Sequence, residues 1–355
     1  MSTIKLKYQD VGGVIDVANW PADEFVIYPE GAREKSLVFC PNKPPQKFLL
    51  GRHPYLFKHS SHNFPEQYWV EILAYRLGAL MGVAVPPAHV AFDSSNGRSG
   101  ALIEWFLTYP DKPTKVGHIG KWVLKWFPRP SVRNLVEILY VPFPKGPVER
   151  YQPGGDVMQR VISDFDRKKG KQHNWEDTSA WCVVLKQHAN LQDDWVPYWA
   201  KTFAFDALIG NTDRHQDNWG IVWRFQELHK FETRFAPVFD NGTSMGHEIS
   251  NDRFPSFDND RLERYVTRGT HHMKWKRRDS ERMNHGAFLN RFCQKYPEAR
   301  NWILTCLDLK FDVVEELIME LTKYNVPVPL TYQRAEFMVK LLRFRHKYLR
   351  AALQL

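Results

Sequence analysis

The chain has 355 residues, of which 43% are hydrophobic and 14% aromatic, so it can bury a sizeable core and intrinsic disorder is excluded. Its 49 lysines and arginines outnumber its 40 acidic residues. The formal net charge of +9 suits an anionic partner such as a nucleotide, a nucleic acid, an acidic protein or a membrane surface, and equally a solvated surface that serves solubility. The four cysteines lie far apart without a CxxC pair, which argues against a zinc ribbon or a disulfide framework and favours a reducing compartment.

The first residues and the hydropathy of the chain predict where in the cell the protein lies. The first residues, MSTIKLKYQDVGG, lack the apolar centre of a signal peptide. No stretch reaches the roughly 18 uncharged apolar residues that a membrane-spanning helix needs. We therefore expect a soluble, cytoplasmic protein without a membrane span.

The first hundred residues predict a strand-rich lobe. Four short apolar or alternating runs are cut by Pro and Gly: DEFVIYP (23–29), KSLVFCP (35–41), KFLLG (47–51) and PYLFKHS (54–60). A helix over 65–82 interrupts them, because its apolar residues recur at helical spacing and Gly82 and Pro86 end it. Two more strands are predicted over 85–92 and 99–107.

Beyond residue 107 the pattern changes to helices and long loops. Residues 144–177 are polar and loop-like at both ends, and the chain closes with amphipathic helices over 311–321 and 332–353. We predict an α+β fold of two lobes, a β-rich N-lobe over residues 1–107 and a mainly helical C-lobe over residues 108–355. A cleft between two lobes is a common place for a ligand.

The segment GNTDRHQDNWG (210–220) follows an apolar run and holds two Asp, two Asn, an Arg and a His. Asn218 lies five residues after Asp213. A phosphoryl-transfer enzyme needs one carboxylate to orient or deprotonate the attacking hydroxyl, and a nearby neutral oxygen to hold Mg²⁺ on the phosphates. An Asp-x4-Asn loop supplies both groups, although Asp and Asn also fill ordinary turns because of their local hydrogen bonds.

A second polar turn follows in FAPVFDNGTS (235–244). We predict that an apolar strand carries Asp240 directly into an Asn-Gly turn. That placement suits a metal-binding carboxylate, which a buried strand fixes and a turn exposes. The alternative is a plain hairpin, because Asp-Asn-Gly is favourable turn chemistry.

Upstream, a lysine and a glutamate are candidates for binding phosphate. Lys58 ends the apolar run PYLFKHS, where an ammonium is poorly solvated without an anionic partner, and Glu71 follows in the early part of the first predicted helix. A strand lysine paired with a helix glutamate holds the α- and β-phosphates of ATP in kinases. A surface lysine and a solvated glutamate are the alternative.

The segment EGAREKS (30–36) combines Gly31 with Arg33 and Lys35, so backbone can approach a phosphate next to positive charge. A single glycine makes a poor glycine-rich loop. The chain has neither GxGxxG nor GxxxxGK[ST], which excludes a Rossmann fingerprint and a Walker A loop. The order loop, Lys, Glu, Asp-x4-Asn, Asp is the order of protein-kinase-like folds.

With these motifs in this order, the chain resembles the HipA-like Ser/Thr kinases, and in particular the short branch without the family's extra N-terminal subdomain. NTDRHQDNWGIV and FAPVFDNGTS are similar to the catalytic and metal-binding segments of the family. EGAREKS resembles its phosphate-binding loop, YLFKHS its strand lysine, EILAYRLGALMGVAVP its N-lobe helix, and ALIEWF the hinge that holds adenine. These matches run in order from about residue 30 to residue 245, and they imply a bilobal protein-kinase-like fold.

The resemblance implies a role for each matching residue. Asp213 would be the catalytic base, and Asn218 and Asp240 would hold Mg²⁺ on the phosphates of ATP. Lys58, held by Glu71, would bind phosphate, and His215 would lie close to the phosphates. The phosphate loop and the adenine-binding hinge would be formed by Gly31, Ala32, Arg33, Glu34 and Lys35, and by Glu104, Trp105 and Phe106.

The resemblance also implies a biological role. The substrate would be a Ser or Thr of a protein, with the translation machinery as a target, and the kinase would act as a bacterial toxin. No antitoxin-like helix-turn-helix is evident, so an antitoxin or inhibitor would be a separate chain. Several family members carry an inhibitory autophosphorylated Ser before the phosphate loop. Here VIYPEG has no Ser or Thr, and only Tyr28 and Ser36 lie nearby, which argues against autoinhibition by that route.

Three other interpretations remain open. NTDRxxDNW with a DNG turn also resembles type II phosphatidylinositol 4-kinases, whose anionic membrane would suit the basic surface, but a CCPCC-like palmitoylation cluster is missing. A pseudokinase would keep the fold and nucleotide binding without catalysis. HHMKWKRR (271–278) would form a nucleic-acid patch if Trp275 stacks on a base, and otherwise a solvated loop.

Overall fold

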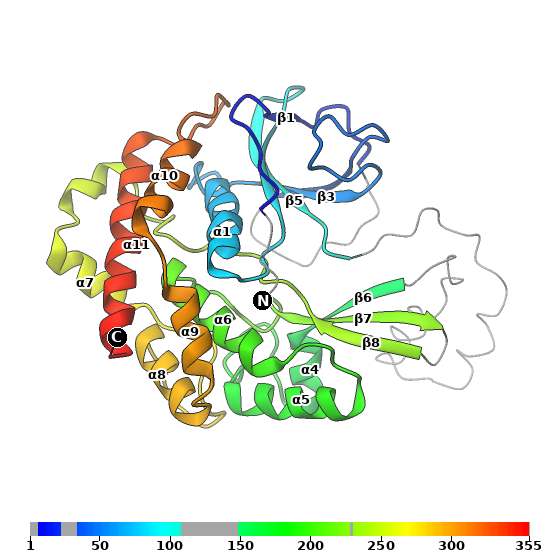
Figure 1. Cartoon of the computed structure of the whole chain (residues 1–355), viewed down its shortest axis with the longest axis vertical. Coiled ribbons are helices and arrows are strands. Elements are labelled where there is room, and N and C mark those ends of the chain that lie inside the picture. Colours follow the sequence, from blue (N-terminus) through cyan, green and yellow to red (C-terminus); the bar gives the residue numbers. More distant parts are fainter. Residues whose placement is uncertain (1–5, 23–33, 108–147, 228–229, 355) are drawn as a thin grey trace.

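The computed structural model places a sheet-rich N-terminal part on a larger, mainly helical part (Figure 1). The predicted strand over 23–29 and the predicted phosphate-loop residues Gly31, Ala32 and Arg33 lie outside the residues that the structure describes. The observed mixture of sheets and helices confirms the predicted α+β class. The described residues are 6–22, 34–107, 148–227 and 230–354.

The described strands of the N-terminal part are β1 (Ile15–Asp16), β2 (Lys35–Phe39), β3 (Pro54–His59), β4 (Ala88–Asp93) and β5 (Arg98–Glu104). They form one sheet in the order β1-β4-β5-β3-β2. Neighbouring strands are antiparallel, except that β1 and β4 run parallel. Lys58 on β3 lies opposite Lys35 on β2, so both lysines are directed to the same face of the sheet.

The predicted strand over 47–51 is wrong, because these residues form turns in the loop between β2 and β3. The Leu50 N–H donates to the Tyr55 hydroxyl at 2.9 Å instead of to a neighbouring strand. The two prolines at 44–45, just before the segment, have no N–H to contribute to a ladder. The apolar run therefore forms a turn, and its Leu49 is buried in the core of the sheet.

The helix α1 (Tyr68–Met81) confirms the predicted helix of the N-terminal part. It ends as expected at Gly82, whose left-handed φ of 64° lets its N–H reach back to the last helical carbonyls. Every residue of α1 except Ala79 and Leu80 is buried. The helix is covered by the N-terminal sheet on one side and by helices of the C-terminal part on the other (Figure 1).

The C-terminal part contains an antiparallel sheet in the order β6-β7-β8 and a set of helices around α6. Its described strands are β6 (Val148–Pro153), β7 (Gly220–Glu227) and β8 (Lys230–Phe235). Its described helices are α4 (Gly154–Val161), α5 (Trp175–His188), α6 (Trp195–Ile209), the short 3-10 helix η1 (Asn251–Ser256), α7 (Asn259–Arg268), α8 (His285–Lys295), α9 (Ala299–Leu307), α10 (Phe311–Leu321) and α11 (Tyr332–Ala352). The last two confirm the predicted C-terminal helices.

The expected loop at the start of 144–177 is wrong from residue 148 onward, because β6 and α4 occupy it. Two glycines begin α4, and because glycine is a poor helix former the sequence pattern did not predict this helix. Packing requires a glycine at position 154, because a Cβ there would lie 2.2 Å from the Trp219 ring. The small residue lets the helix start against a buried aromatic side chain of the loop before β7.

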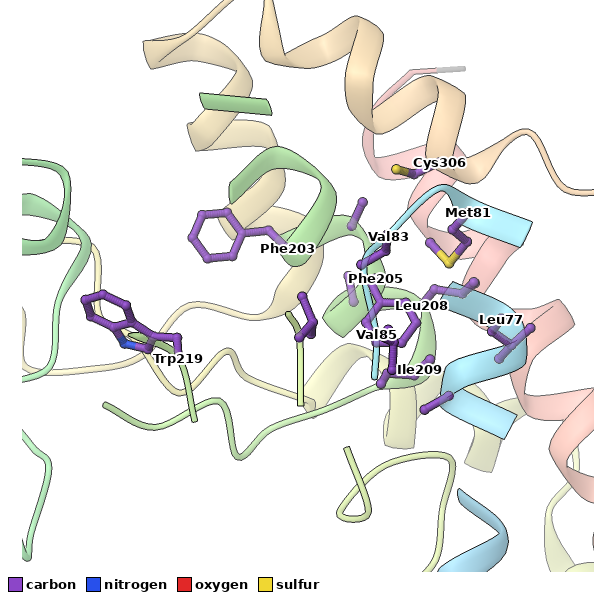
Figure 2. Packing of buried hydrophobic residues seen from close by; sticks show 14 of the residues in the cluster. Leu77, Met81, Val83, Val85, Phe203, Phe205, Leu208, Ile209, Trp219 and Cys306 are labelled. Carbon is purple, nitrogen blue, oxygen red and sulfur yellow. The ribbon is translucent and has the colours of Figure 1, made fainter. Parts of the chain in front are cut away.

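One hydrophobic core joins the two parts of the molecule. Leu77 and Met81 of α1 belong to the same cluster as Leu208 and Ile209 of α6 and Cys306 of α9 (Figure 2). The shared core holds the two parts in a defined relation to one another. Among the described helices, none has both the length and the apolar character that crossing a bilayer requires.

The segment 271–278 does not provide the base-stacking platform that the nucleic-acid interpretation requires. Trp275 is only 6% exposed. Its ring packs edge-on against Phe288, and the Arg291 guanidinium lies 5.0 Å from its centroid. Trp275 is therefore a core residue of the C-terminal part.

Candidate active site

The first polar turn begins where α6 ends. Gly210 caps the helix in the left-handed conformation, with a φ of 69°, and turns the chain out of the core. The Asp213 N–H then donates to Asn211 Oδ1 at 2.9 Å, and Asn218 Nδ2 donates to the Asp213 carbonyl at 2.8 Å. Asp213 and Asn218, which are five residues apart in sequence, are thereby held in one loop.

Arg214, which sequence reasoning missed, anchors this loop. Its side chain is buried and donates to both carboxylate oxygens of Asp206 on α6, at 2.8 and 3.0 Å. It also donates to the Asn218 carbonyl at 3.1 Å, to the Phe239 carbonyl, and to Asn241 Oδ1 at 2.6 Å. Both polar turns of the sequence are therefore attached to one buried cation.

Asp206 stays ionised in spite of complete burial. Burial by itself raises the pKa of a carboxyl, but Arg214 and His271 outweigh it and hold the pKa of Asp206 at about 2. The sequence signal that could have revealed this pair is an Asp inside the apolar helix segment AFDALI, eight residues before an Arg in a polar loop. An unpaired carboxylate at such a position would be very costly.

The segment that carries Asp240 differs from the prediction. The strand β8 ends at Phe235, and Pro237, which has no N–H for a ladder, interrupts it before Asp240. The Val238 N–H donates instead to the Ala84 carbonyl, at 2.7 Å, just after α1. Asp240 has a φ of 55°, which is uncommon for a residue other than glycine and typical of a functional constraint.

Lys58, Glu71 and Asp240 form one group of ion pairs, which we call the lysine triad. Lys58 Nζ lies 2.7 Å from Glu71 Oε1 and 2.5 Å from Asp240 Oδ1. Lys58 and Glu71 are buried, whereas the Asp240 side chain is 37% exposed, so the triad opens to solvent at Asp240. Glu71 Oε2 also accepts the Asn241 N–H at 3.0 Å. A strand, a helix and a loop that are distant in sequence meet at this lysine.

Asp213 is half-buried within the electrostatic reach of the triad. Burial raises the pKa of its carboxyl, and the negative charge of Asp240 adds to the rise, while His215 and Arg214 act in the opposite direction. A carboxylate whose pKa is raised accepts a proton more readily than a fully solvated one. The position therefore suits a general base, which the sequence proposed for Asp213.

His215 packs within the same loop. Its backbone N–H donates to the Asp213 carbonyl at 2.7 Å, and its Nδ1 accepts the Asp217 N–H at 3.2 Å. Its ring lies edge-on to His272, with 5.9 Å between the centroids. The Asp217 carboxylate pairs with Arg167 at 2.6 Å, which fixes the far end of the turn. His215 thus supports the charge environment of Asp213.

The predicted hinge continues β5 past its pairing with Tyr55 at the start of β3. The Glu104 N–H donates to the Pro87 carbonyl at 2.8 Å, and the Trp105 N–H donates to the Pro54 carbonyl at 3.2 Å. The Phe106 N–H has no hydrogen-bond partner among the described residues. At Phe106 the backbone thus retains a donor for a ligand, whereas the donors of Glu104 and Trp105 serve the fold.

The Phe106 side chain connects the hinge to the second polar turn. Its ring stacks on Phe239, with 5.4 Å between the centroids, and Phe239 directly precedes Asp240. The Phe106 carbonyl accepts from Arg234 at 3.0 Å. The hinge and the segment of Asp240 therefore form two walls of the same region.

Of the predicted phosphate loop, the structure describes Glu34 and Lys35. The Glu34 carboxylate accepts hydrogen bonds from both terminal nitrogens of Arg98, at 2.9 and 2.7 Å, at the exposed start of β5. Lys35 is half-buried and lies opposite Lys58 in the sheet. Glu34 is thus engaged in a surface ion pair, while Lys35 belongs to the face of the sheet that carries Lys58.

The oxygen atoms of Asn218 and Asp240 suit Mg²⁺, a hard cation that prefers carboxylate and amide oxygens. Asn218 Nδ2 is occupied by the Asp213 carbonyl, which leaves the amide oxygen as a ligand atom. In the described ranges, no group of three or more His, Cys, Asp or Glu could hold a metal by itself. Mg²⁺ needs no such group when substrate phosphates supply further oxygens. The donor set therefore fits the ion that the sequence resemblance implies.

Solved structures identify the fold. The Helicobacter pylori proinflammatory kinase CtkA is similar, with a TM-score of 0.67 and 15% identity over 96% of this chain and 97% of that chain. HipA of the Shewanella oneidensis MR-1 toxin–antitoxin system, solved with HipB and operator DNA, matches at 13% identity and a TM-score of 0.40 over 92% of this chain and 65% of that chain. No protein-family model and no curated protein matches the sequence. The chain has the fold of the CtkA kinase, which confirms the predicted kinase-like fold.

Proposed function

We propose that the chain is a kinase that transfers the γ-phosphate of ATP to a Ser or Thr of a protein. The observation that carries the proposal is the lysine triad of Lys58, Glu71 and Asp240, built next to Asp213 and Asn218 on the fold of a kinase. A structural ion pair needs one lysine and one carboxylate. A buried lysine shared by a fixed glutamate and a half-open aspartate is typical of a site that awaits phosphate.

Lys58 holds the phosphates in this proposal. Glu71 stays with the lysine, because its other oxygen is tied to the Asn241 N–H at 3.0 Å. Asp240 is the partner that can turn away, because its side chain is partly exposed. A triphosphate would then take the place of Asp240 on the ammonium, and Asp240 would turn to the metal.

The hinge would bind the adenine ring. The edge of adenine offers a ring nitrogen that accepts a hydrogen bond, and the Phe106 N–H is a donor without a partner among the described residues. The aromatic pair of Phe106 and Phe239 gives this region an apolar wall, as nucleotide pockets commonly have.

Asn218 and Asp240 would hold Mg²⁺ through their side-chain oxygens. When bound, the ion neutralises the charge that develops on the transferred phosphoryl group. The Asn218 amide is already oriented by its bond to the Asp213 carbonyl. Arg214 fixes the backbone on both sides, since it binds the Asn218 and Phe239 carbonyls.

Asp213 would act as the general base. It accepts the proton of the Ser or Thr hydroxyl while that oxygen attacks the γ-phosphorus. The bond from the γ-phosphorus to the β–γ bridging oxygen breaks, and ADP leaves with the electron pair. Burial and the negative charge of Asp240 raise the pKa of Asp213, which favours the proton transfer.

The test is transfer of label from γ-labelled ATP, with magnesium, to protein extract or to phosphatidylinositol vesicles. We expect label in protein Ser or Thr, and a rate about 10²–10⁴ lower for Asp213→Ala, the usual worth of a positioned acid or base. Label only in lipid would instead establish a phosphatidylinositol kinase. Nucleotide binding without any transfer by the wild-type chain would establish a pseudokinase.

From the resemblance to HipA-like kinases, we also propose a role as a bacterial toxin that acts on the translation machinery and is restrained by a separate inhibitor chain. Expression of the wild-type chain should then arrest growth, and Asp213→Ala should not. Equal arrest by both variants would mean that toxicity does not come from phosphoryl transfer. Growth with both variants would remove the toxin role and leave the kinase proposal untouched.

A further inference from the structure

A large cavity opens beside Asp213. Its volume is about 1090 Å³, and Thr212, Asp213 and Thr243 from the two polar turns line part of it. Seven Lys or Arg residues but only two carboxylates, Asp213 and Glu248, are among the described residues that line it. The space next to the proposed base is therefore strongly cationic.

The helix α7 contributes three of these cations. Arg261, Arg264 and Arg268 recur at spacings of three and four residues, so they lie on one face of the helix. Leu262 and Val266 bury the other face. From Arg261 to Arg268 the helix rises by about 10 Å, which equals about three residues of extended chain. The arginine row thus has the length of a short peptide segment.

Among the described residues, Asp260 and Glu263 lie on the same helix but form no ion pair with the arginine row. In the described part of the chain, no carboxylate pairs with Arg253, Arg264 or Arg268, and all three are exposed. Glu248 is occupied, because it accepts the Tyr265 hydroxyl at 2.7 Å and lies 3.2 Å from His247. Like charges held so close together without partners are unfavourable for the free protein, so an anionic partner would relieve them.

The lining favours an acidic peptide over a nucleic acid or a membrane. A base would need an exposed ring to stack on, but Phe257 is buried beneath Arg261, whose guanidinium lies 4.4 Å from the ring centroid. Tyr265 is held by Glu248. None of the exposed large apolar side chains in the described residues lines the cavity, so it offers nothing to insert into a bilayer.

We propose that this cavity binds an acidic stretch of the protein substrate, next to the Ser or Thr that Asp213 deprotonates. The inference rests on the proposed kinase function and adds the substrate class. Aspartate and glutamate side chains would pair with Arg253, Arg264 and Arg268, and the acceptor hydroxyl would thereby be brought to Asp213. Acidic residues that flank the acceptor would then govern substrate choice.

The test compares two labelled peptides of equal length, one with a Ser flanked by four Asp or Glu and one with Asn or Gln at those positions. Binding is measured without nucleotide by fluorescence anisotropy, so it does not depend on transfer. We expect the acidic peptide to bind about tenfold tighter to the wild-type chain, and Arg264→Glu/Arg268→Glu to lose that preference. The same preference should appear in kcat/KM for transfer to the Ser.

The matched control is Lys347→Glu/Arg350→Glu, which makes the same change of charge on exposed positions of α11 outside the cavity. It should keep the preference, and Arg264→Gln/Arg268→Gln should lose it without charge reversal. Equal binding of both peptides, or equal loss in the control, overturns the proposal. A third outcome also overturns it: Arg264→Glu/Arg268→Glu loses binding to a single-stranded RNA or to phosphatidylinositol 4-phosphate vesicles but still binds the acidic peptide. Acidic-peptide binding without any transfer would instead refute the kinase function and leave the site.

Discussion

Arg214 and Arg264 carry the same charge in opposite surroundings. Arg214 is buried, and its guanidinium meets the Asp206 carboxylate, two carbonyls and the Asn241 amide. Arg264 is exposed on α7 and pairs with no carboxylate among the described residues. The buried cation has all its partners inside the molecule and therefore acts on geometry. The exposed one has no carboxylate partner within the described ranges, so it can act on another molecule.

If the chain is the kinase we propose, this contrast separates two tasks of its site. A catalytic loop must be held to a fraction of an ångström, and a satisfied buried network does this because any displacement leaves a charge unpaired. Substrate choice requires groups that are vacant before the substrate arrives, so those groups stay on the surface. Removing the buried charge of Arg214 should therefore lower stability, whereas removing the exposed charge of Arg264 should weaken substrate binding.

The largest effect is expected from Arg214→Met. The substitution leaves the ionised Asp206 buried without its partner, which should lower the free energy of unfolding by about 3–5 kcal/mol. Urea unfolding measures this, with Arg264→Met as the matched control. The control should change stability by less than about 0.5 kcal/mol, since it removes an exposed side chain that forms no ion pair with the rest of the described chain. Equal losses in the two variants would remove the distinction between them.

The second effect concerns the pH dependence of the buried pair. The pKa of Asp206 is held at about 2 in the folded chain, below the value of about 3.9 in the unfolded chain. A depressed pKa means that the stabilisation is complete above the unfolded value and is lost as the pH falls from about 4 to 2. Asp206 should contribute about 2–3 kcal/mol at neutral pH by this route.

Unfolding of the wild type and of Asp206→Asn at several pH values tests this prediction. The variant should be less stable at pH 7, and the difference should shrink toward pH 2. A difference that stays constant with pH would show that packing, and not ionisation, is what Asp206 contributes.

A third effect separates the lysine triad from the arginine row. In the proposed site, Lys58→Met would remove charged hydrogen bonds to the phosphates, each worth about 1.5–3 kcal/mol, so the Kd for magnesium-ATP should rise about 10–100-fold. Titration calorimetry measures it, with Lys347→Met as the control at an exposed position of α11. The Kd for the acidic peptide should not change. Weaker peptide binding with intact nucleotide binding would assign Lys58 to the substrate and not to ATP.

The smallest effect is expected from Arg264→Ala. A single exposed ion pair is worth about 0.2–1 kcal/mol, so the KM for the acidic peptide should rise about two- to fivefold. Because salt screens exposed charges, the difference from the wild type should vanish at about 1 M salt. Steady-state kinetics at two salt concentrations give both values. A difference that survives high salt would mean that Arg264 acts by packing.

Sequence alone located the local elements and the polar turns. The helix α1 was predictable because its apolar spacing and Gly82 are local signals, and Asp213 and Asn218 were recognisable from a five-residue spacing. Lys58 and Glu71 were candidates because a charged residue at the end of an apolar strand requires a partner. In contrast, β6 and α4 were not predicted, because a glycine pair that packs on Trp219 is typical of a loop in sequence.

The tertiary structure decided which of these groups meet. Nothing local links Asp240 to Lys58, 182 residues away, or Arg214 to the Asn241 amide. The neighbours of the left-handed Asp240 are held from afar, since Val238 bonds the Ala84 carbonyl and Asn241 bonds Glu71 of α1. The cationic cavity likewise combines α7 with the two polar turns. Residue type and spacing determine which groups can do chemistry, because they act over a few residues. Their assembly into one site depends on long-range packing, in which residues far apart along the chain come to share one core.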